Sequence, residues 1–431
     1  MDNKPKYNIL MLGWEFYPVF AGGMGVVTSE IVDGLTDANI GVHFVIPRLP
    51  KKIEIEKVHI TSAEAFIPSE SSLFTVNNYS SILKRTYVDT VYAPYETKNI
   101  FNQSEVTKYN ERVKVNFENK VTNPNSIYHN DLFADIKMFE DKSALIALEN
   151  NFDIIHAHDW LTFRAAIKAK ELTGKPVVLH VHATEIDRSG ENVNTVIFDI
   201  EKECLEKADY VIAVSAKTKN DIIKHYNIPE NKVFVVHNSS NFHQPHTRSI
   251  LSKEDKIVLF LGRITMQKGA EYFIQAAAKV LRFLPDTIFV MVGDGDKLQE
   301  CIDLVNELNI EKNFIFTGFL TGHNKERMYS SADLFVMPSV SEPFGVVALE
   351  AIRSGTPVIV SKTSGAAEII NNSLKIDFWD VNKLADTMHA TLKYQSLHDE
   401  MIENQGRDLN EQNWNHQIDA IIKVYELATK N

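Results

Sequence analysis

The stretch "DLFVMPSVSEPFGVVALEAIRSGTPVIVS", residues 333–361, decides the fold class of this chain. Its two ends, residues 333–338 and 356–361, are short apolar runs bounded by proline or polar residues, which is typical of buried strands. Residues 346–354 between them predict a helix, which is entered through a loop that Pro338 and Pro343 hold extended. A strand, a crossover helix and a second strand predict a parallel β–α–β unit.

The same alternation extends outward from this unit in both directions. Apolar runs predict further strands at residues 8–13, 42–46, 152–157, 176–181, 209–214, 232–236, 256–262, 287–293 and 313–318, with intervening helices such as 24–38 and 268–283. This pattern predicts an α/β chain of two facing Rossmann-like domains. Ligands of open parallel sheets bind beyond the carboxyl ends of the strands, so we expect the active site in the cleft between the domains.

Composition shifts indicate the domain boundaries. We assign residues 1–240 to the first domain, with an irregular insertion of hairpins and loops at about 50–130, which is rich in Asn, Ser and Lys. Residues 241–255 are polar, contain Pro245 and lack periodicity, so they are the best linker candidate. Residues 256–405 form the second domain, and residues 406–431 are expected to form a C-terminal helix whose partner the sequence does not identify.

Bulk composition excludes several classes of protein. A chain of 431 residues with 44% hydrophobic content can bury the cores of two or three domains. Its net charge of −12 argues against a nucleic-acid groove or an anionic membrane surface as partner. Cys204 and Cys301 stand in no CxxC context, which fits a reducing cytoplasm, and we expect neither a signal peptide nor a membrane anchor. The oligomeric state stays open.

Two loops contain residues suited to holding phosphate. In "GWEFYPVFAGGMGVV", residues 13–27, Gly22 and Gly23 would let backbone amides approach an anion before a helix, although a flexible turn explains the pattern equally well. In "GRITMQKG", residues 262–269, Arg263 and Lys268 stand beside a predicted helix terminus and predict a diphosphate site. A solvated loop with ordinary surface charge is the alternative.

The opening stretch carries two glutamates, Glu342 and Glu350. Carboxylates near a cleft can accept hydrogen bonds from neighbouring hydroxyls, as on a sugar or a ribose. Phe344, Gly345 and Val346 would offer free backbone amides where the helix begins. A structural role for each carboxylate, at the N-cap for Glu342 and as a helix-dipole partner for Glu350, is the alternative.

Histidines follow two predicted strands. His156 and His158 share one face of their strand, as His180 and His182 do of theirs, and Asp159 follows the first pair. Four such histidines invite a metal interpretation, but no carboxylate completes a recognised ligand spacing, so we expect no metal site. "GDGD" at residues 293–296 is better explained as a glycine turn with an Asp N-cap than as a metal motif.

Taken in order, "GGMG", "HAHDW", "HVHATE", "GRITMQKG", "GDGD", "SEPFGVVALEA" and "SGAAE" resemble the retaining GT-B glycosyltransferases of family 4 and the related glycogen and starch synthases. The resemblance spans nearly the whole chain. It implies that His182 contacts the transferred sugar, that Asp159 is a nearby active-site acid, and that Arg263 and Lys268 bind the diphosphate. It also implies that Glu342 holds sugar hydroxyls.

Further residues are placed in the donor site by the same resemblance. Glu350 would hold the nucleotide ribose. Backbone contacts to the donor are implied for Gly22, Gly23, Gly293, Phe344, Gly345 and Val346, and Ser364 and Gly365 stand where the family has a glycine pair near the phosphate.

The implied activity is transfer of a hexosyl group, most simply glucosyl, from a nucleotide-diphosphate sugar to a glycan, with retention and with no metal or other cofactor. Three alternatives stay open. They are a nucleotide-sugar 2-epimerase on the same fold, a transferase that acts on a small-molecule or lipid acceptor, and a non-catalytic binding protein. The sequence does not identify the nucleotide base, the sugar or the acceptor.

Overall fold

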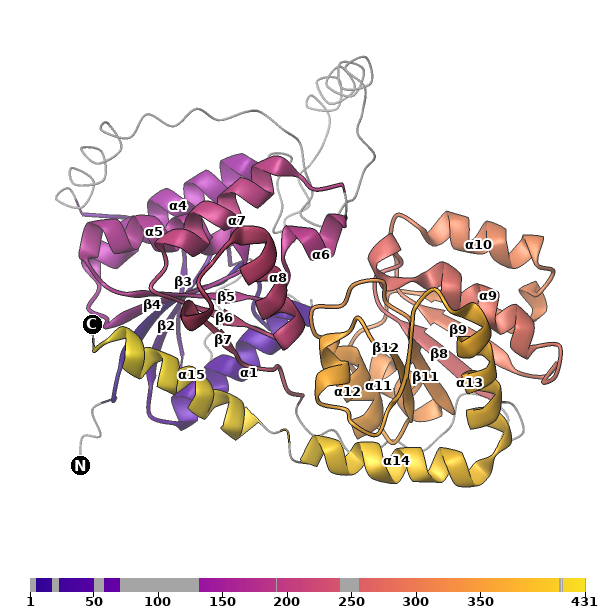
Figure 1. The fold of residues 1–431 in the computed structure, drawn as a ribbon. Coiled ribbons are helices and arrows are strands. Elements are labelled where there is room, and N and C mark those ends of the chain that lie inside the picture. The colour runs from indigo at the N-terminus through magenta and orange to yellow at the C-terminus, as the bar shows by residue number, and fades with distance from the viewer. Residues whose placement is uncertain are drawn as a thin grey trace, which may run out of the picture.

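The computed structural model describes residues 5–17, 23–49, 58–69, 132–190, 192–240, 256–410, 412 and 414–430. These residues form two wholly parallel β-sheets, each with helices on both faces (Figure 1). The two doubly wound domains lie side by side and confirm the predicted fold class.

The first domain is built on a sheet with the strand order β3-β2-β1-β4-β5-β6-β7. Its strands are β1 (Asn8–Leu12), β2 (Gly41–Ile46), β3 (His59–Ser62), β4 (Ile154–His158), β5 (Val177–Val181), β6 (Tyr210–Ala213) and β7 (Val233–Val235). Its helices are α1 (Gly23–Asp37), α4 (Leu132–Glu149), α5 (Trp160–Thr173), α6 (Glu185–Ser189), α7 (Thr195–Lys207) and α8 (Ala216–Tyr226).

The second domain has the strand order β10-β9-β8-β11-β12-β13. Its strands are β8 (Ile257–Leu261), β9 (Ile288–Val292), β10 (Phe314–Gly318), β11 (Leu334–Met337), β12 (Val358–Ser361) and β13 (Leu374–Ile376). Its helices are α9 (Ala270–Val280), α10 (Leu298–Glu307), α11 (Gly322–Ser331), α12 (Val346–Arg353), α13 (Val381–Lys393) and α14 (Gln395–Asn410). The opening stretch forms β11, α12 and β12, and β11 pairs with β12 in parallel, as predicted.

Each sheet is sandwiched between two apolar cores because successive side chains of a strand point to opposite faces. In β1, Leu10 and Leu12 pack into the core beneath α4, α5 and α7. Ile9 and Met11 pack into the opposite core, beneath α1 and the last helix of the chain. Burial on both faces explains why the strands are continuous apolar runs rather than alternating ones.

The C-terminal segment consists of two helices that contact different domains. Residues 406–410 belong to α14, which packs against α12 and α13 of the second domain. The chain then returns to the first domain as α15 (Trp414–Ala428), which packs against α1 (Figure 1). Gly34 permits this contact, since a Cβ atom there would lie 2.5 Å from Cγ1 of Ile418.

The insertion predicted at about 50–130 is only partly within the described residues, since residues 50–57 and 70–131 fall outside them. The expectation of hairpins was wrong for His59–Ser62. These residues form β3, which pairs in parallel with β2 at the edge of the sheet. An edge strand whose four residues are exposed or half-buried gives little apolar signal in the sequence.

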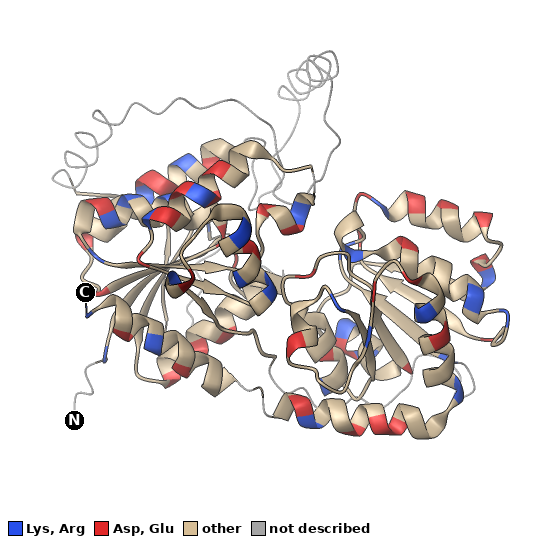
Figure 2. Ribbon diagram, viewed as in Figure 1, with Lys and Arg blue, Asp and Glu red and all other residues tan. Residues whose placement is uncertain are grey.

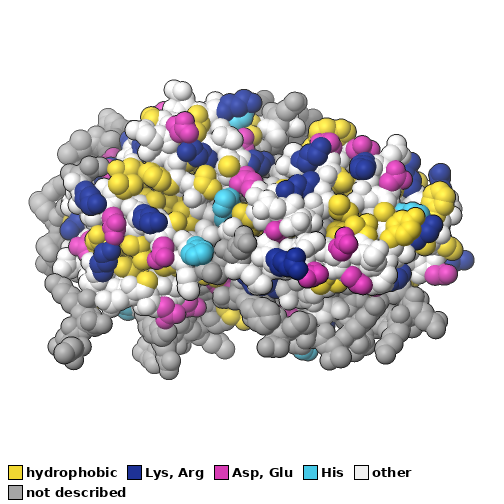
Figure 3. Space-filling model, turned by 60° about the horizontal axis from the view of Figure 1, so that its bottom comes forward, with side chains coloured by type: hydrophobic (Ala, Val, Ile, Leu, Met, Phe, Trp, Pro, Cys, Tyr) yellow, Lys and Arg dark blue, Asp and Glu magenta, His cyan; other side chains and the backbone are white. Residues whose placement is uncertain are grey.

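Charged residues of both signs are distributed over the helices of both domains (Figure 2). The face that carries α14 and α15 likewise mixes basic, acidic and apolar side chains (Figure 3). Among the described helices, none has both the length and the apolar character that crossing a bilayer requires.

Candidate active site

A cavity of about 720 Å³ lies between the two domains. The first domain lines it with Tyr17 and with one side of α1, which includes Gly23 and Glu30. The second domain lines it with loops at the carboxyl ends of its strands, which carry Arg263, Lys268, Gly293 and Glu342 among others. The cavity therefore lies where the sequence predicts a ligand site, because open parallel sheets present their strand-end loops there.

Lys268 and Glu342 form an ion pair at this cavity. Lys268 ends the short 3-10 helix η2 (Met266–Lys268), and its Nζ lies 2.5 Å from Oε2 of Glu342. Glu342 is only 5% exposed, and the same carboxylate oxygen accepts a hydrogen bond of 3.3 Å from the Ser339 hydroxyl. Arg263 is exposed on the loop after β8, so two cations and one buried carboxylate converge on the cavity.

Glu350 lies on α12, and its carboxylate binds two side chains of α11. Nζ of Lys325 donates to Oε1 at 2.7 Å, and the Tyr329 hydroxyl donates to Oε2 at 2.8 Å. Burial and the Glu350 carboxylate raise the pKa of Tyr329 well above its usual value, so its hydroxyl remains a donor. Each oxygen has a remaining lone pair that can accept a ribose hydroxyl.

Two glycines of the cavity wall differ in what they permit. Gly293 has a φ of 140°, and a Cβ atom there would lie 1.8 Å from the carbonyl oxygen of Gly262. Only glycine fits where these two strand-end loops touch. Gly23 begins α1, and a Cβ atom there would meet no described atom within 4 Å, whereas Gly22 lies outside the described residues.

Ser364 and Gly365 lie behind the Glu342 loop and are not in the cavity lining. The Ser364 hydroxyl donates to the carbonyl of Phe344 at 3.0 Å, and the Gly365 amide donates to the carbonyl of Glu342 at 3.0 Å. A Cβ atom on Gly365 would lie 2.2 Å from the Pro343 carbonyl oxygen. These contacts support the loop, and the predicted phosphate contact stays a prediction.

The start of α12 faces the cavity. Gly345 has a φ of 99° and precedes the first helical residue, Val346, which lines the cavity together with Val347. Phe344 is only 3% exposed, and its carbonyl accepts a hydrogen bond of 2.6 Å from the Ala366 amide. The unpaired amides of a helix N-terminus favour an anion.

Asp159 and His182 form a unit at the carboxyl ends of β4 and β5 and are not in the cavity lining. Asp159 has a φ of 57°, which is uncommon outside glycine, and its Oδ1 accepts the His182 amide at 2.6 Å and the Ala183 amide at 3.3 Å. Burial raises the pKa of Asp159 to about 7. Burial also lowers the pKa of His182 to about 4, so this ring is neutral at physiological pH.

Four histidine rings stack against one another in a cluster where the neighbouring strands β4 and β5 end. His156 stacks on His158 with ring centres 4.6 Å apart, and His180 stacks on His182 at 4.3 Å. Nδ1 of His156 lies 2.6 Å from the Tyr425 hydroxyl of α15. His158 and His180 face each other in the strand register, because β4 and β5 are neighbours.

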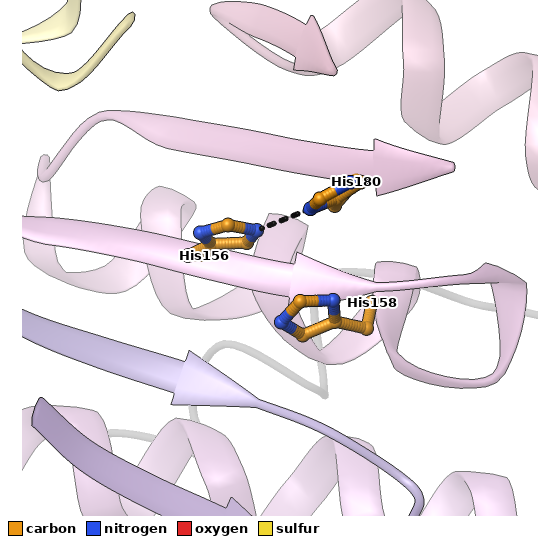
Figure 4. A group of neighbouring side chains, drawn as sticks. All are labelled: His156, His158 and His180. Carbon is orange, nitrogen blue, oxygen red and sulfur yellow. Dashed lines mark hydrogen bonds between the residues drawn. The ribbon is translucent and has the colours of Figure 1, made fainter. Parts of the chain in front are cut away.

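Among the described residues, three of these rings lie close enough together to hold a metal ion. One nitrogen each from His156, His158 and His180 lies within 4.8 Å of the others (Figure 4). Nε2 of His156 and Nδ1 of His180 are 3.3 Å apart, a distance that a shared hydrogen explains without an ion.

Contacts between the domains include residues that the sequence did not single out. The Ser341 hydroxyl of the Glu342 loop donates to Asp187 of α6 at 2.8 Å. Glu368 of the second domain accepts the Ala216 and Lys217 amides at the start of α8, each at 2.8 Å. His237 contacts the same carboxylate at 2.8 Å. "SGAAE" offered Glu368, but nothing local indicated its partner in the other domain.

A second hollow of about 740 Å³ lies beside the edge strand β7. Lys219 and Glu230, which line it, pair with each other at 3.4 Å. We therefore assign function to the interdomain cavity, where cations and carboxylates from separate loops converge.

Comparison with known proteins gives the family. Residues 243–408 match the glycosyl transferases of group 1, and residues 104–241 match glycosyltransferase family 4. An uncharacterized glycosyltransferase of Methanocaldococcus jannaschii is 32% identical over 309 residues, which cover 67% of this chain and 78% of the relative.

Two further matches carry the names of specific enzymes. Glycogen synthase of Mycobacterium tuberculosis is 28% identical over 225 residues, which cover 51% of this chain and 54% of that protein. The solved structure of sucrose-phosphate synthase from Thermosynechococcus elongatus superimposes with a TM-score of 0.72 at 18% identity, covering 98% of this chain and 99% of that one. At that identity the superposition shows the fold alone.

Proposed function

Because the chain is a GT-B glycosyltransferase of the family 4 and group 1 type, we propose that it transfers a glucosyl group from a nucleotide-diphosphate sugar to a glycan acceptor, with retention of configuration. The observation that carries this proposal is the convergence of Arg263, Lys268, Glu342 and Glu350 on one interdomain cavity. The likeness to glycogen synthase favours a glucan acceptor.

The second domain binds the donor diphosphate in this proposal. Arg263 and Lys268 meet the negative charge that develops on the leaving phosphate as the glycosidic bond breaks. The amides at Val346 and Val347 add the positive end of α12. Glu342 holds Lys268 in place before the donor arrives, since the two side chains are already paired at 2.5 Å.

The carboxylates orient the hydroxyl groups of the donor. Glu342 accepts hydrogen bonds from the transferred sugar, and Glu350 accepts them from the ribose. His182 and Asp159 complete the sugar site from the first domain. Support for this placement comes from α6, which follows the His182 segment and contacts η2, the element that carries Lys268.

The reaction proceeds by front-face attack of the acceptor hydroxyl and needs no metal ion or other cofactor. Two cations and a helix terminus already supply the charge that a divalent ion would offer to a diphosphate. Closure of the cleft excludes water and limits hydrolysis of the donor. We also propose a cytoplasmic location, which the buried thiols of Cys204 and Cys301 support.

The direct test is a donor and acceptor screen. UDP-glucose, ADP-glucose, UDP-galactose and GDP-mannose are each incubated with glycogen or with small sugar acceptors, and released nucleotide is measured. We expect release that depends on the acceptor with a glucosyl donor. An epimer formed without acceptor would overturn the proposal in favour of a 2-epimerase.

A matched pair of variants ties the activity to the cavity. Glu342→Ala should leave a folded protein with turnover reduced on the order of 100- to 1,000-fold. Glu300→Ala removes an exposed carboxylate of α10 outside the cavity lining and should leave turnover unchanged. Equal turnover in both variants would sink the assignment.

A further inference from the structure

His158 contacts the ring of His182 from the neighbouring strand. Nδ1 of His158 and Nε2 of His182 are 2.9 Å apart, a distance that requires one shared hydrogen. We propose that His158 is a positioning residue that donates this hydrogen and thereby holds His182 in the tautomer with its hydrogen on Nδ1. The functional part of the proposal rests on the proposed role of His182 at the transferred sugar.

The direction of the hydrogen bond follows from the other nitrogen of His158. His158 is fully buried, and its Nε2 has no hydrogen-bond partner among the residues that the structure describes. If His182 donated, Nε2 of His158 would carry a buried hydrogen with no acceptor. If His158 donates from Nδ1, its Nε2 is a bare lone pair, and buried acceptors without partners are tolerated better than buried donors.

Both rings are neutral, as a hydrogen bond in which one ring nitrogen donates and the other accepts requires. Burial lowers the pKa of His158 well below its usual value, and it lowers the pKa of His182 to about 4. His180 packs against both rings, with centres 5.3 Å from His158 and 4.3 Å from His182, and so restricts rotation of the His182 ring.

A fixed tautomer has a chemical consequence. With Nε2 occupied as an acceptor, His182 presents only Nδ1–H, which can donate to a hydroxyl oxygen of the transferred sugar but cannot remove a proton from it. The histidine then orients the sugar and does not act as a general base.

Nuclear magnetic resonance of the full chain labelled with ¹⁵N histidine tests the tautomer without substrate. Two-bond ¹H–¹⁵N couplings distinguish a protonated ring nitrogen from a bare one. His182→Asn identifies the His182 signals by their loss. We expect a protonated Nδ1 and a bare Nε2 on His182, and a hydrogen on Nε2 would overturn the proposal.

His158→Phe removes the hydrogen bond and keeps a buried planar ring. The His182 signals should then shift toward the Nε2–H tautomer, and kcat should fall roughly twofold to tenfold, the worth of one hydrogen bond, with the donor KM nearly unchanged. His158→Gln retains an amide donor and should restore part of both effects. An unchanged tautomer in His158→Phe contradicts the proposal.

His43→Phe is the matched control. The His43 ring packs against the His59 ring with centres 4.3 Å apart, and His43 is not in the cavity lining. It should leave the His182 signals and kcat as they are. If His158→Phe does not fold, the wild-type spectrum alone decides. If the spectrum shows the expected tautomer but no donor supports transfer, the proposed function is wrong and the hydrogen bond from His158 to His182 still stands.

Discussion

Replacing Lys268 and Glu342 singly and together should separate their contribution to stability from their contribution to catalysis. Lys268→Met leaves a carboxylate whose side chain is 7% exposed without its cation, whereas Glu342→Gln leaves an ammonium that is 18% exposed and faces the cavity. We expect Lys268→Met to lower the free energy of unfolding by about 3 kcal/mol, the lower end for an uncompensated buried charge, because the Ser339 hydroxyl remains.

Glu342→Gln should cost less, about 1 kcal/mol, because water in the cavity hydrates the ammonium group of Lys268 and the amide keeps a hydrogen bond. In the double variant no charge is left unpaired, so its stability should return to within about 1 kcal/mol of the wild type. Turnover should not return, since both groups act on the donor. All three variants should lose on the order of 100- to 1,000-fold in kcat.

Urea unfolding with a constant m-value gives the three free energies, and nucleotide release with a saturating donor gives the three rates. A double variant that regains turnover would refute the reasoning, because the pair would then serve the fold only. Equal stability losses in the two single variants would contradict the asymmetry in burial.

Three further perturbations have expected outcomes. Burial lowers the pKa of His156 from 6.5 to about 3, so below about pH 6.5 the unfolded chain takes up a proton that the folded chain does not, and the free energy of unfolding falls. His156→Gln should reduce the slope of this free energy against pH by about 1.4 kcal/mol per pH unit between pH 6 and 4, as measured by urea titrations. Gly293→Ala should lower the free energy of unfolding by roughly 2 kcal/mol or more, since its Cβ atom would meet the carbonyl of Gly262. Gly406→Ala in α14, where an added Cβ atom meets no described atom within 4 Å, should raise it by about 0.5 kcal/mol, as thermal unfolding measures. Glu368→Ala removes the acceptor of two α8 amides and so weakens the contact between the domains. X-ray scattering should show a larger radius of gyration, and donor titrations should show a weaker affinity. An unchanged radius would contradict the role of Glu368 in holding the domains together.

The strands could be predicted from the sequence because parallel strands covered on both faces are continuous apolar runs. β3 and β13 could not, since "HITS" and "LKI" are short edge strands with partly exposed residues. The position of the cavity could be predicted from the strand ends, and Arg263, Lys268, Glu342 and Glu350 all line it.

Long-range contacts explain what the sequence did not reveal. The order of the histidine rings depends on β4 and β5 being neighbours, and Tyr425 reaches His156 only because α15 returns to the first domain. Glu368 meets the start of α8 across 152 positions of sequence. Ser364 and Gly365 support the Glu342 loop from behind, a role that no pattern around them indicates.

The most direct test of the central claim is transfer itself, followed in the presence of EDTA. Wild-type protein is incubated with UDP-glucose or ADP-glucose and an acceptor, and the anomeric configuration of the new bond is read by nuclear magnetic resonance. The account predicts an α-linked product whose formation EDTA does not slow and Glu342→Ala nearly abolishes. A β-linked product, a requirement for a divalent ion, or full turnover in Glu342→Ala would contradict it.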